Sequence, residues 1–451
     1  MKLSFKGSKI TPIKKATLVI SVILLVVKLV NFFIDLLVAQ YFGINENVDI
    51  YLYALMIPLL FNAVLANSFN QYFIPNYLKV KARENEEYKK DYLLIVFVCY
   101  AILVLIVSLI CCNILPKFLI RINPTLFHSG DLIESYLRFS LWLGIYFFFF
   151  TVSNVFTSIL QAEHYYSASL YPQIYIPLIG VISMLIFHHQ LGIFSIIYGF
   201  VLGSIISFML LFLKTVQKKI FSLKQLRFNF HILKTGTDYH QFLYLLIALI
   251  FPNVLSFIDK QMASYLGAGK LSALSYGQGI PNALSSILIY SLGISVFSYF
   301  SEWFVKDNVT KLIHAVRKAI YFLLIIIIPF CYYIFLFSED IIGVLFERGN
   351  FTGSDTIIVS QIMQFYIFSI FLTATTTIAT RIVSAIHKNH FFIIFYPSIF
   401  ILKLLLNAMF VPFLNIFGLP AATLAMYIVD SIWIYWYLHR KNVPIFNLGY
   451  F

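Results

Sequence analysis

Long apolar runs recur along the whole chain, separated by short polar segments. Most runs reach about 20 residues, enough for a helix to cross the hydrocarbon core of a bilayer. They are continuously apolar, whereas strands of a membrane barrel would alternate apolar and polar positions. The pattern therefore predicts twelve transmembrane helices, at residues 16–42, 48–78, 92–115, 131–160, 166–187, 191–213, 240–266, 271–300, 314–337, 356–386, 390–412 and 418–438.

The motif FIDxxxAxYxG occurs twice, at Phe33–Gly43 and again 224 residues later at Phe257–Gly267. An offset kept through apolar sequence indicates a tandem duplication. Six crossings return the chain to its starting side, so the two halves have the same orientation. We therefore expect an all-α polytopic membrane protein with two pseudo-symmetric six-helix lobes. The lobes are residues 1–238, ending in a basic linker, and residues 239–451.

Composition and charge agree with a membrane protein. Hydrophobic residues make up 61% of the chain and charged residues 11%, against about a quarter charged in soluble domains. The net charge is +13, yet one predicted side carries most of the basic residues outside the helices. This asymmetry predicts cytoplasmic termini and accounts for the basic excess without a nucleic-acid partner. The other side carries Lys117, Arg121, Lys270 and Arg348.

Motifs of soluble catalysis are missing from the sequence. It contains no Walker loop, HExxH, GxSxG or CxxC pattern, and its loops are too short to form a soluble domain. The four cysteines fall inside predicted helices, without metal-ligand spacing. The first apolar run is too long for a cleaved signal peptide and is expected to remain as a helix. We expect no enzyme activity, no cofactor and no metal.

Charged and amide residues inside the predicted helices are the candidates for function. Lys28 and Asp35 are seven residues apart, so they lie on one helix face. Such charges must be paired or hydrated, so Lys28 is either a cavity cation or the ion-pair partner of Asp35. Asp35 and Asp259 could equally serve to join helices. Asn62, in a polar stripe of the second helix, lines a wet space or bonds a neighbouring helix.

The segment 345–356, LFERGNFTGSDT, carries a family resemblance. It resembles the loop before the tenth helix of MurJ/MviN-type lipid II flippases, members of the multidrug/oligosaccharidyl-lipid/polysaccharide exporter superfamily. Residues 49–58, FIPNYL at 73–78 and the run from Asp259 to Gly267 are similar to other parts of that family. The resemblance implies two lobes around a central cavity, alternating access, and an undecaprenyl-diphosphate-linked saccharide as substrate.

The resemblance also suggests substrate-binding positions. Lys28 stands where the family has its first helix 1 arginine, and Asp35 matches the aspartate of an Arg-Asp pair whose arginine is Ile34 here. Family arginines are replaced at Asn62–Ala63, and an Asp-Arg pair at Gln278–Gly279. Lys260 could supply a compensating cation. The substrate-binding set expected from this resemblance is Lys28, Asp35, Asp49, Asn62, Lys260 and Gln278.

A sodium site is proposed for the family among the seventh, eleventh and twelfth helices. Asp259 and Thr423 match that site, but Lys403 and Asn407 stand where oxygen ligands are expected. The lysine would place its ammonium in the position of the metal, paired with Asp259. We therefore predict an internal ion pair and no bound sodium.

The helix pattern together with this resemblance implies a flippase that moves a lipid-linked saccharide outward across a bacterial inner membrane. Its expected partners are that substrate and the membrane lipids, and it is expected to be a monomer. An O-antigen or capsule-type exporter of the same superfamily is the first alternative. A drug/cation antiporter would require an anionic cavity. A membrane glycosyltransferase or ligase would need acidic or histidine chemistry on outer loops, which are short here.

Overall fold

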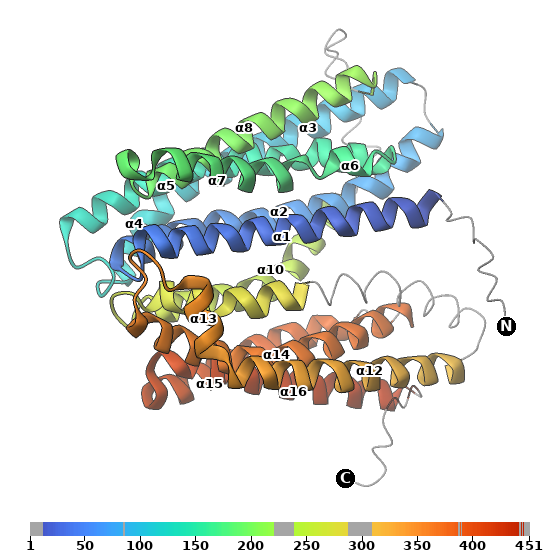
Figure 1. The fold of residues 1–451 in the computed structure, drawn as a ribbon. Coiled ribbons are helices and arrows are strands. Elements are labelled where there is room, and N and C mark those ends of the chain that lie inside the picture. Colours follow the sequence, from blue (N-terminus) through green and yellow to red (C-terminus); the bar gives the residue numbers. More distant parts are fainter. Residues whose placement is uncertain are drawn as a thin grey trace, which may run out of the picture.

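The computed structural model describes residues 12–83, 86–220, 239–286, 309–386, 388, 390–441, 443 and 445, and this part of the chain is built of helices. Figure 1 shows two groups of long helices that run side by side. The first lobe contains α1 (Pro12–Phe42), α2 (Glu46–Arg83), α3 (Glu86–Leu109), α4 (Leu115–Ile122), α5 (Gly130–Ala162), α6 (Tyr166–Ser169), α7 (Tyr171–Leu191) and α8 (Phe194–Gln217). The second lobe contains α10 (Tyr239–Ala263), the helical segment 270–286, α12 (Val309–Leu336), α13 (Ser338–Phe346), α14 (Gly353–Ala385), α15 (Phe391–Leu414) and α16 (Gly418–Arg440).

The predicted fold class is confirmed. Within the described residues, nine helical stretches are long and apolar enough to cross a membrane, or ten when the bent pair in α10 counts as one span. One of the nine, Phe391–Arg440, contains both α15 and α16. The eighth predicted helix is described only over residues 270–286. The predicted lobe boundary at residue 238 lies outside the described residues, which stop at 220 and resume at 239.

Several helices differ from their predicted extents. The third continues through a π-helical turn, Ile110–Ile114, into α4, and the fifth is broken into α6 and α7. The nine-residue helix α13 was not predicted, because a search for membrane-length runs does not detect so short an amphipathic helix. Its acidic first turn suits the positive end of the helix dipole.

Two helix starts show how local sequence sets the ends of the helices. Thr352 and Asp355 are three residues apart in the sequence, which is the spacing of a capping box, and Thr352 N–H donates to Asp355 Oδ2 at 2.9 Å just before α14. Asp49 follows the polar turn before the second apolar run, where the sequence alone suggests it as the cap of that helix, but it lies inside α2 and does not cap it. The cap is Asn45, whose Oδ1 accepts from the backbone N–H of Val48 at 3.0 Å. Asp49 is thereby free for another contact.

Small residues allow α7 and α8 to pack closely. A Cβ on Gly199 would lie 2.7 Å from the Cα of Gly180, which leaves room only for hydrogen. Ser183 Oγ donates to the carbonyl of Ser195 at 2.6 Å across the same contact. Small side chains with interhelical hydrogen bonds are the usual means of helix association in lipid. The first lobe therefore has a rigid wall on this side.

The two lobes are joined at the end of the molecule that the charge pattern predicts to face outward, on the left in Figure 1. We call this junction the outer seam; it comprises residues 40–53 and 122–123 of the first lobe and 261–276 and 349–351 of the second. Asn350 N–H donates to Gln40 O at 2.9 Å. Asp49 Oδ1 accepts from the backbone N–H of Ser272 at 2.7 Å. Tyr276 OH donates to the carbonyl of Gly43 at 3.2 Å.

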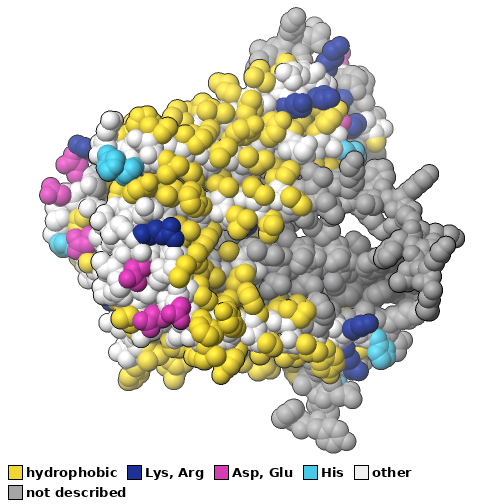
Figure 2. All heavy atoms as spheres, viewed as in Figure 1, with side chains coloured by type: hydrophobic (Ala, Val, Ile, Leu, Met, Phe, Trp, Pro, Cys, Tyr) yellow, Lys and Arg dark blue, Asp and Glu magenta, His cyan; other side chains and the backbone are white. Residues whose placement is uncertain are grey.

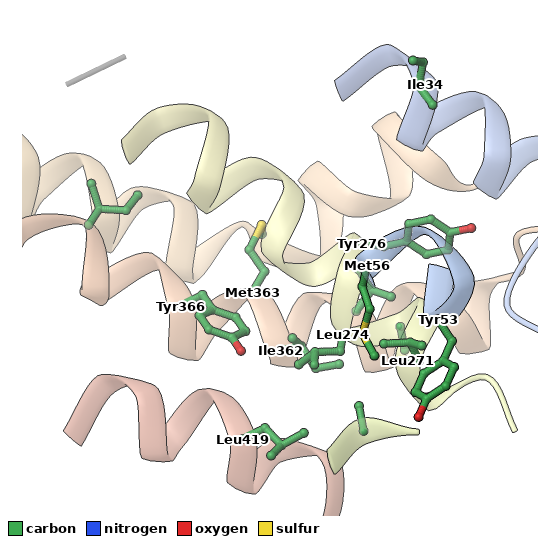
Figure 3. Close-up of a cluster of buried hydrophobic side chains, with 14 of the residues drawn as sticks. Ile34, Tyr53, Met56, Leu271, Leu274, Tyr276, Ile362, Met363, Tyr366 and Leu419 are labelled. Carbon is green, nitrogen blue, oxygen red and sulfur yellow. The ribbon is translucent and has the colours of Figure 1, made fainter. Parts of the chain in front are cut away.

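Apolar side chains fill the space beneath the outer seam. Figure 3 shows Tyr53 and Met56 of α2 close to Leu271 and Leu274 of the second lobe. Tyr53 is fully buried, and its hydroxyl donates to Gln261 Oε1 at 2.8 Å. The packing and the hydrogen bonds together close this end of the protein.

Gly43 provides a test of the outer seam. Its φ is +70°, and a Cβ there would lie 2.4 Å from the carbonyl oxygen of Asn350. We expect Gly43→Ala to cost about 1–2 kcal/mol of stability from the left-handed backbone alone, plus the overlap. Thermal unfolding of the purified protein in detergent measures this cost. Gly130→Ala is the matched control, since no atom lies within 4 Å of its added Cβ; equal shifts would contradict a tight seam.

Candidate functional site

A central cavity of about 320 Å³ lies between the two lobes. The first lobe contributes Lys28 and Asp35 from α1, and the second contributes Lys260 from α10 and Gln278 from the segment 270–286. Four of the six predicted substrate-binding residues therefore come together, from segments more than 200 residues apart in sequence. Their predicted role in binding substrate stays a prediction.

A second cavity of about 460 Å³ lies between helices of the second lobe, and we call it the second-lobe cavity. Lys28, Gln278 and Asn282 line both cavities, so the two spaces meet at these side chains. The second-lobe cavity is rich in hydroxyl groups, contributed by Ser285, Ser286, Tyr366, Ser369, Thr373, Thr423 and Tyr427. Such a lining can donate and accept many hydrogen bonds.

Lys28 lines both cavities, and among the described residues no carboxylate is in salt-bridge contact with it. It makes no salt bridge with Asp35, although the two residues share a helix face and line the same space. The charged neighbour of Asp35 is Lys260, which comes from the opposite lobe. Lys28, Asp35 and Lys260 are all only partly buried. A charge inside a membrane protein requires a partner or hydration, so the ammonium of Lys28 is available to water or to a ligand in the cavity.

Gln278 is fixed at the junction of the two cavities. Its Nε2 donates to the hydroxyl of Tyr366 in α14 at 2.6 Å. This contact holds the side-chain amide where the central cavity and the second-lobe cavity meet. A ligand that extends from one cavity to the other would pass both Gln278 and Lys28.

The four residues predicted to form an ion site or an ion pair meet among α10, α15 and α16. Lys403 Nζ lies 2.9 Å from Asp259 Oδ1 and donates to Thr423 Oγ1 at 2.5 Å. Asn407 Nδ2 donates to Asp259 Oδ1 at 3.0 Å, and Thr423 Oγ1 donates to Asp259 Oδ2 at 2.9 Å. Lys403 is 1% exposed. The carboxylate is therefore neutralised and hydrogen-bonded on both oxygens.

These residues do not fit a bound sodium ion. The ammonium of Lys403 already stands among the oxygens of Asp259, Thr423 and the Leu419 carbonyl, the last at 3.3 Å. A metal ion in the same place would meet a like charge at contact distance. Among the described residues, no group of three His, Cys, Asp or Glu side chains could hold a metal.

Asp49 and Asn62 lie away from both cavities. Asp49 is fully buried in the outer seam, where it bonds the backbone of Ser272. Asn62 Oδ1 accepts from Thr151 Oγ1 at 3.0 Å and from Asn154 Nδ2 at 3.3 Å, both on α5. Of the two roles considered for Asn62, the structure therefore shows the interhelical one. The comparison with the arginine positions of the family did not predict these contacts of Asp49 and Asn62.

The hydroxyl lining of the second-lobe cavity was not predicted from the sequence. Tyr366, Ser369 and Thr373 lie on one face of α14, at spacings of three and four residues. The run TATTTIAT at 373–380 was the available signal. This run does not by itself indicate a cavity, because threonine is also common at helix contacts in membranes, where it bonds its own backbone or a neighbouring helix.

Comparisons with known proteins show which family shares this sequence and architecture. Residues 38–450 match the family model for the lipid II flippase MurJ. A probable lipid II flippase MurJ from Buchnera aphidicola subsp. Schizaphis graminum is 25% identical, over 97% of this chain and 86% of its own length. One from Aquifex aeolicus is 24% identical, over 96% of this chain and 85% of its own length.

Two solved structures share the fold. The lipid II flippase MurJ in its inward closed conformation superimposes with a TM-score of 0.79 at 20% identity, over 94% of this chain and 87% of that one. A multidrug resistance MATE family transporter in its inward-facing conformation gives 0.73 at 13% identity, over 95% of this chain and 98% of that one. At these identities both likenesses concern the fold alone.

The ion pair gives a direct test of this part of the site. We expect Lys403→Ala to lower the free energy of unfolding by about 3–5 kcal/mol, because Asp259 would remain as a buried, unpaired carboxylate. Thermal unfolding in detergent measures the loss. The double variant Lys403→Met with Asp259→Asn removes both charges and should recover most of it. A single variant as stable as the double one would show that the pair does not hold these helices.

Sodium dependence gives a second test. Exchanging sodium chloride for choline chloride at equal ionic strength should leave the unfolding midpoint of the unaltered protein unchanged, because Lys403 already occupies the centre of the oxygen cluster. Lithium chloride serves as the control for an unspecific cation effect. A sodium-specific rise in the midpoint would contradict the internal ion pair as a substitute for the metal.

Proposed function

This chain belongs to the MurJ family of lipid II flippases, and we propose that it moves a polyprenyl-diphosphate-linked saccharide from the cytoplasmic to the outer leaflet. Family membership rests on the match over residues 38–450. The observation that carries the proposal for this chain is the position of Lys28, which lies where two polar cavities meet and makes no salt bridge with any described residue. We assign the protein no catalytic step.

A diphosphate would be bound by cations from both lobes. Lys28 and Lys260 line the central cavity from opposite lobes, and Asp35 is the one carboxylate among its described lining residues. An anion held there would interact with both lobes at once and could couple its own binding to their relative position. Lysine acts as a mobile point charge, whereas the arginines of the family would bind phosphate in a fixed bidentate geometry. We infer looser headgroup geometry here.

The saccharide would occupy the second-lobe cavity. This space adjoins Lys28 and carries hydroxyl groups from α14 and α16, with the amides of Gln278 and Asn282 at its entrance. Sugar hydroxyls pair with such groups, at a net gain of about 0.5–1.5 kcal/mol for each hydrogen bond. The second-lobe cavity thus suits the saccharide part of the substrate better than an apolar drug.

Transport would proceed by rocking of the two lobes, residues 1–238 and 239–451. The outer seam closes one end through a small set of hydrogen bonds and close backbone approaches. Opening the seam while the opposite end closes would expose the cavities to the outer side. We further propose a monomer in a bacterial inner membrane with both termini cytoplasmic, as the distribution of basic residues indicates.

The charge of the cavities disfavours a drug/cation antiporter. Such a protein needs uncompensated carboxylates for its cationic substrate. Here Asp259 is paired with Lys403, and Asp35 faces Lys260. An O-antigen or capsule-type exporter would use the same kind of cavity. Complementation in a cell, where the available substrate is known, distinguishes such an exporter from a lipid II flippase.

Complementation tests both the substrate and Lys28. In a bacterium depleted of its lipid II flippase, the unaltered protein and Lys28→Arg should restore growth, and Lys28→Ala should fail. Loss of one charge-assisted contact is worth about 1.5–3 kcal/mol, or roughly 10- to 100-fold in transport. Lys79→Ala, at an exposed position outside both cavities, is the matched control.

The outcomes separate the two parts of the proposal. Rescue by Lys28→Ala at equal protein level would remove Lys28 from substrate binding. Failure of the unaltered protein, with correct membrane insertion, would refute lipid II as the substrate and favour another lipid-linked saccharide.

A further inference from the structure

A lateral groove of about 580 Å³ lies on the second lobe, bounded by α12, α14 and α16. It shares no lining residue with the central cavity or the second-lobe cavity. Its side walls include Leu324, Ile432 and Trp436, whose side chains are 38%, 65% and 43% exposed. The groove therefore opens on the flank of the lobe, which the bilayer surrounds.

The hydroxyl groups of Tyr435 and Ser431 in the walls are satisfied within the protein. Tyr435 OH donates to the carbonyl of Thr375 at 2.9 Å, and Ser431 Oγ is bonded to Thr376 Oγ1 at 3.0 Å. The groove consequently offers hydrocarbon and aromatic surface to its occupant. An empty groove in contact with lipid would forfeit dispersion contacts, so an acyl chain is the natural occupant.

One end of the groove is basic. His439 lines it, and its Nδ1 is buried with no hydrogen-bond partner among the described residues. The guanidinium of Arg440 stacks 4.0 Å from the ring of Trp436, which is itself part of the wall. Lys441 is exposed next to it. Figure 2 shows basic and histidine side chains gathered at the right-hand end of the lower lobe, beside its apolar flank.

We propose that this groove binds an anionic phospholipid. One acyl chain lies along α16 from His439 to Ser431, a length of about 12 Å at 1.5 Å per residue. The phosphate lies against Arg440 at the end that the charge pattern predicts to be cytoplasmic, where anionic lipids attract basic clusters. The site is separate from the proposed transport path, so it holds a bound lipid of the membrane and not the translocated substrate.

The test uses the purified full chain in detergent with native mass spectrometry. Dioleoyl phosphatidylglycerol and dioleoyl phosphatidylcholine are titrated at equal concentration, and the bound fraction of each is measured. The anionic lipid should bind several-fold more tightly. Arg440→Gln should weaken its binding roughly five-fold, as expected for one basic side chain at an anionic lipid, and Arg440→Lys should retain most of it.

Lys218→Gln is the matched control. Lys218 Nζ lies 4.8 Å from the ring of Tyr165 on the first lobe, a similar cation–aromatic contact outside the groove. Its replacement should leave lipid binding unchanged. Leu324→Trp fills the apolar part of the groove without altering its charge, so it should abolish the binding of phosphatidylglycerol. The unfolding midpoint of this variant without lipid should equal that of the unaltered protein.

Four results would overturn the proposal: equal binding of the two lipids, equal effects of Arg440→Gln and Lys218→Gln, undiminished binding to Leu324→Trp, or displacement of phosphatidylglycerol by an undecaprenyl diphosphate. If Arg440→Gln does not fold, the lipid comparison on the unaltered protein and Leu324→Trp still decide. None of these readouts depends on transport, so the groove and the flippase proposal can fail independently.

Discussion

The cost of a charge in hydrocarbon governs the arrangement of this protein. An ionised side chain at the centre of a membrane helix costs about 2.5–3.5 kcal/mol even on the mildest scale, so each one requires a partner, a hydrated space or a helix end. Lys403 has Asp259 as its partner. Lys28 and Lys260 face the central cavity. Arg440 lies at the end of its helix, stacked on Trp436. Position in the bundle thus separates the structural charges from those available to a ligand.

The two copies of the repeated motif show how context divides that role. Asp35 and Asp259 occupy equivalent positions in the duplicated sequence. Asp259 is sealed by Lys403, whereas the corresponding stretch of the first lobe, residues 177–179, is Pro-Leu-Ile and offers no cation. Asp35 therefore faces the cavity and the lysine of the other lobe. Duplication thus supplied two equivalent aspartates. Lys403 pairs with Asp259 and makes it part of the scaffold, whereas Asp35 has no such neighbour among the described residues of its own lobe and lines the cavity.

The outer seam combines tight backbone approach with few hydrogen bonds. Its bonds, such as Asp49 to Ser272 and Asn350 to Gln40, each contribute about 1 kcal/mol net. A junction of this kind is specific in geometry because Gly43 permits no side chain there. The alternating access proposed above would require these bonds to break and re-form. Stability of the lobes resides elsewhere, in contacts such as the glycine-mediated packing of α7 on α8.

The sequence by itself determined the membrane class, the helical architecture, the duplication and the meeting of Asp259 with Lys403, because hydropathy, residue spacing and family motifs are properties of the chain. The contacts of Asp49 and Asn62 were not determined in this way, nor were the hydroxyl lining contributed by α14 and the lateral groove beside α16. Those features depend on which helix faces are opposed, and a helix sequence that is apolar nearly all round does not encode its neighbour. Only tertiary packing decided whether a given polar side chain joins helices or lines a cavity.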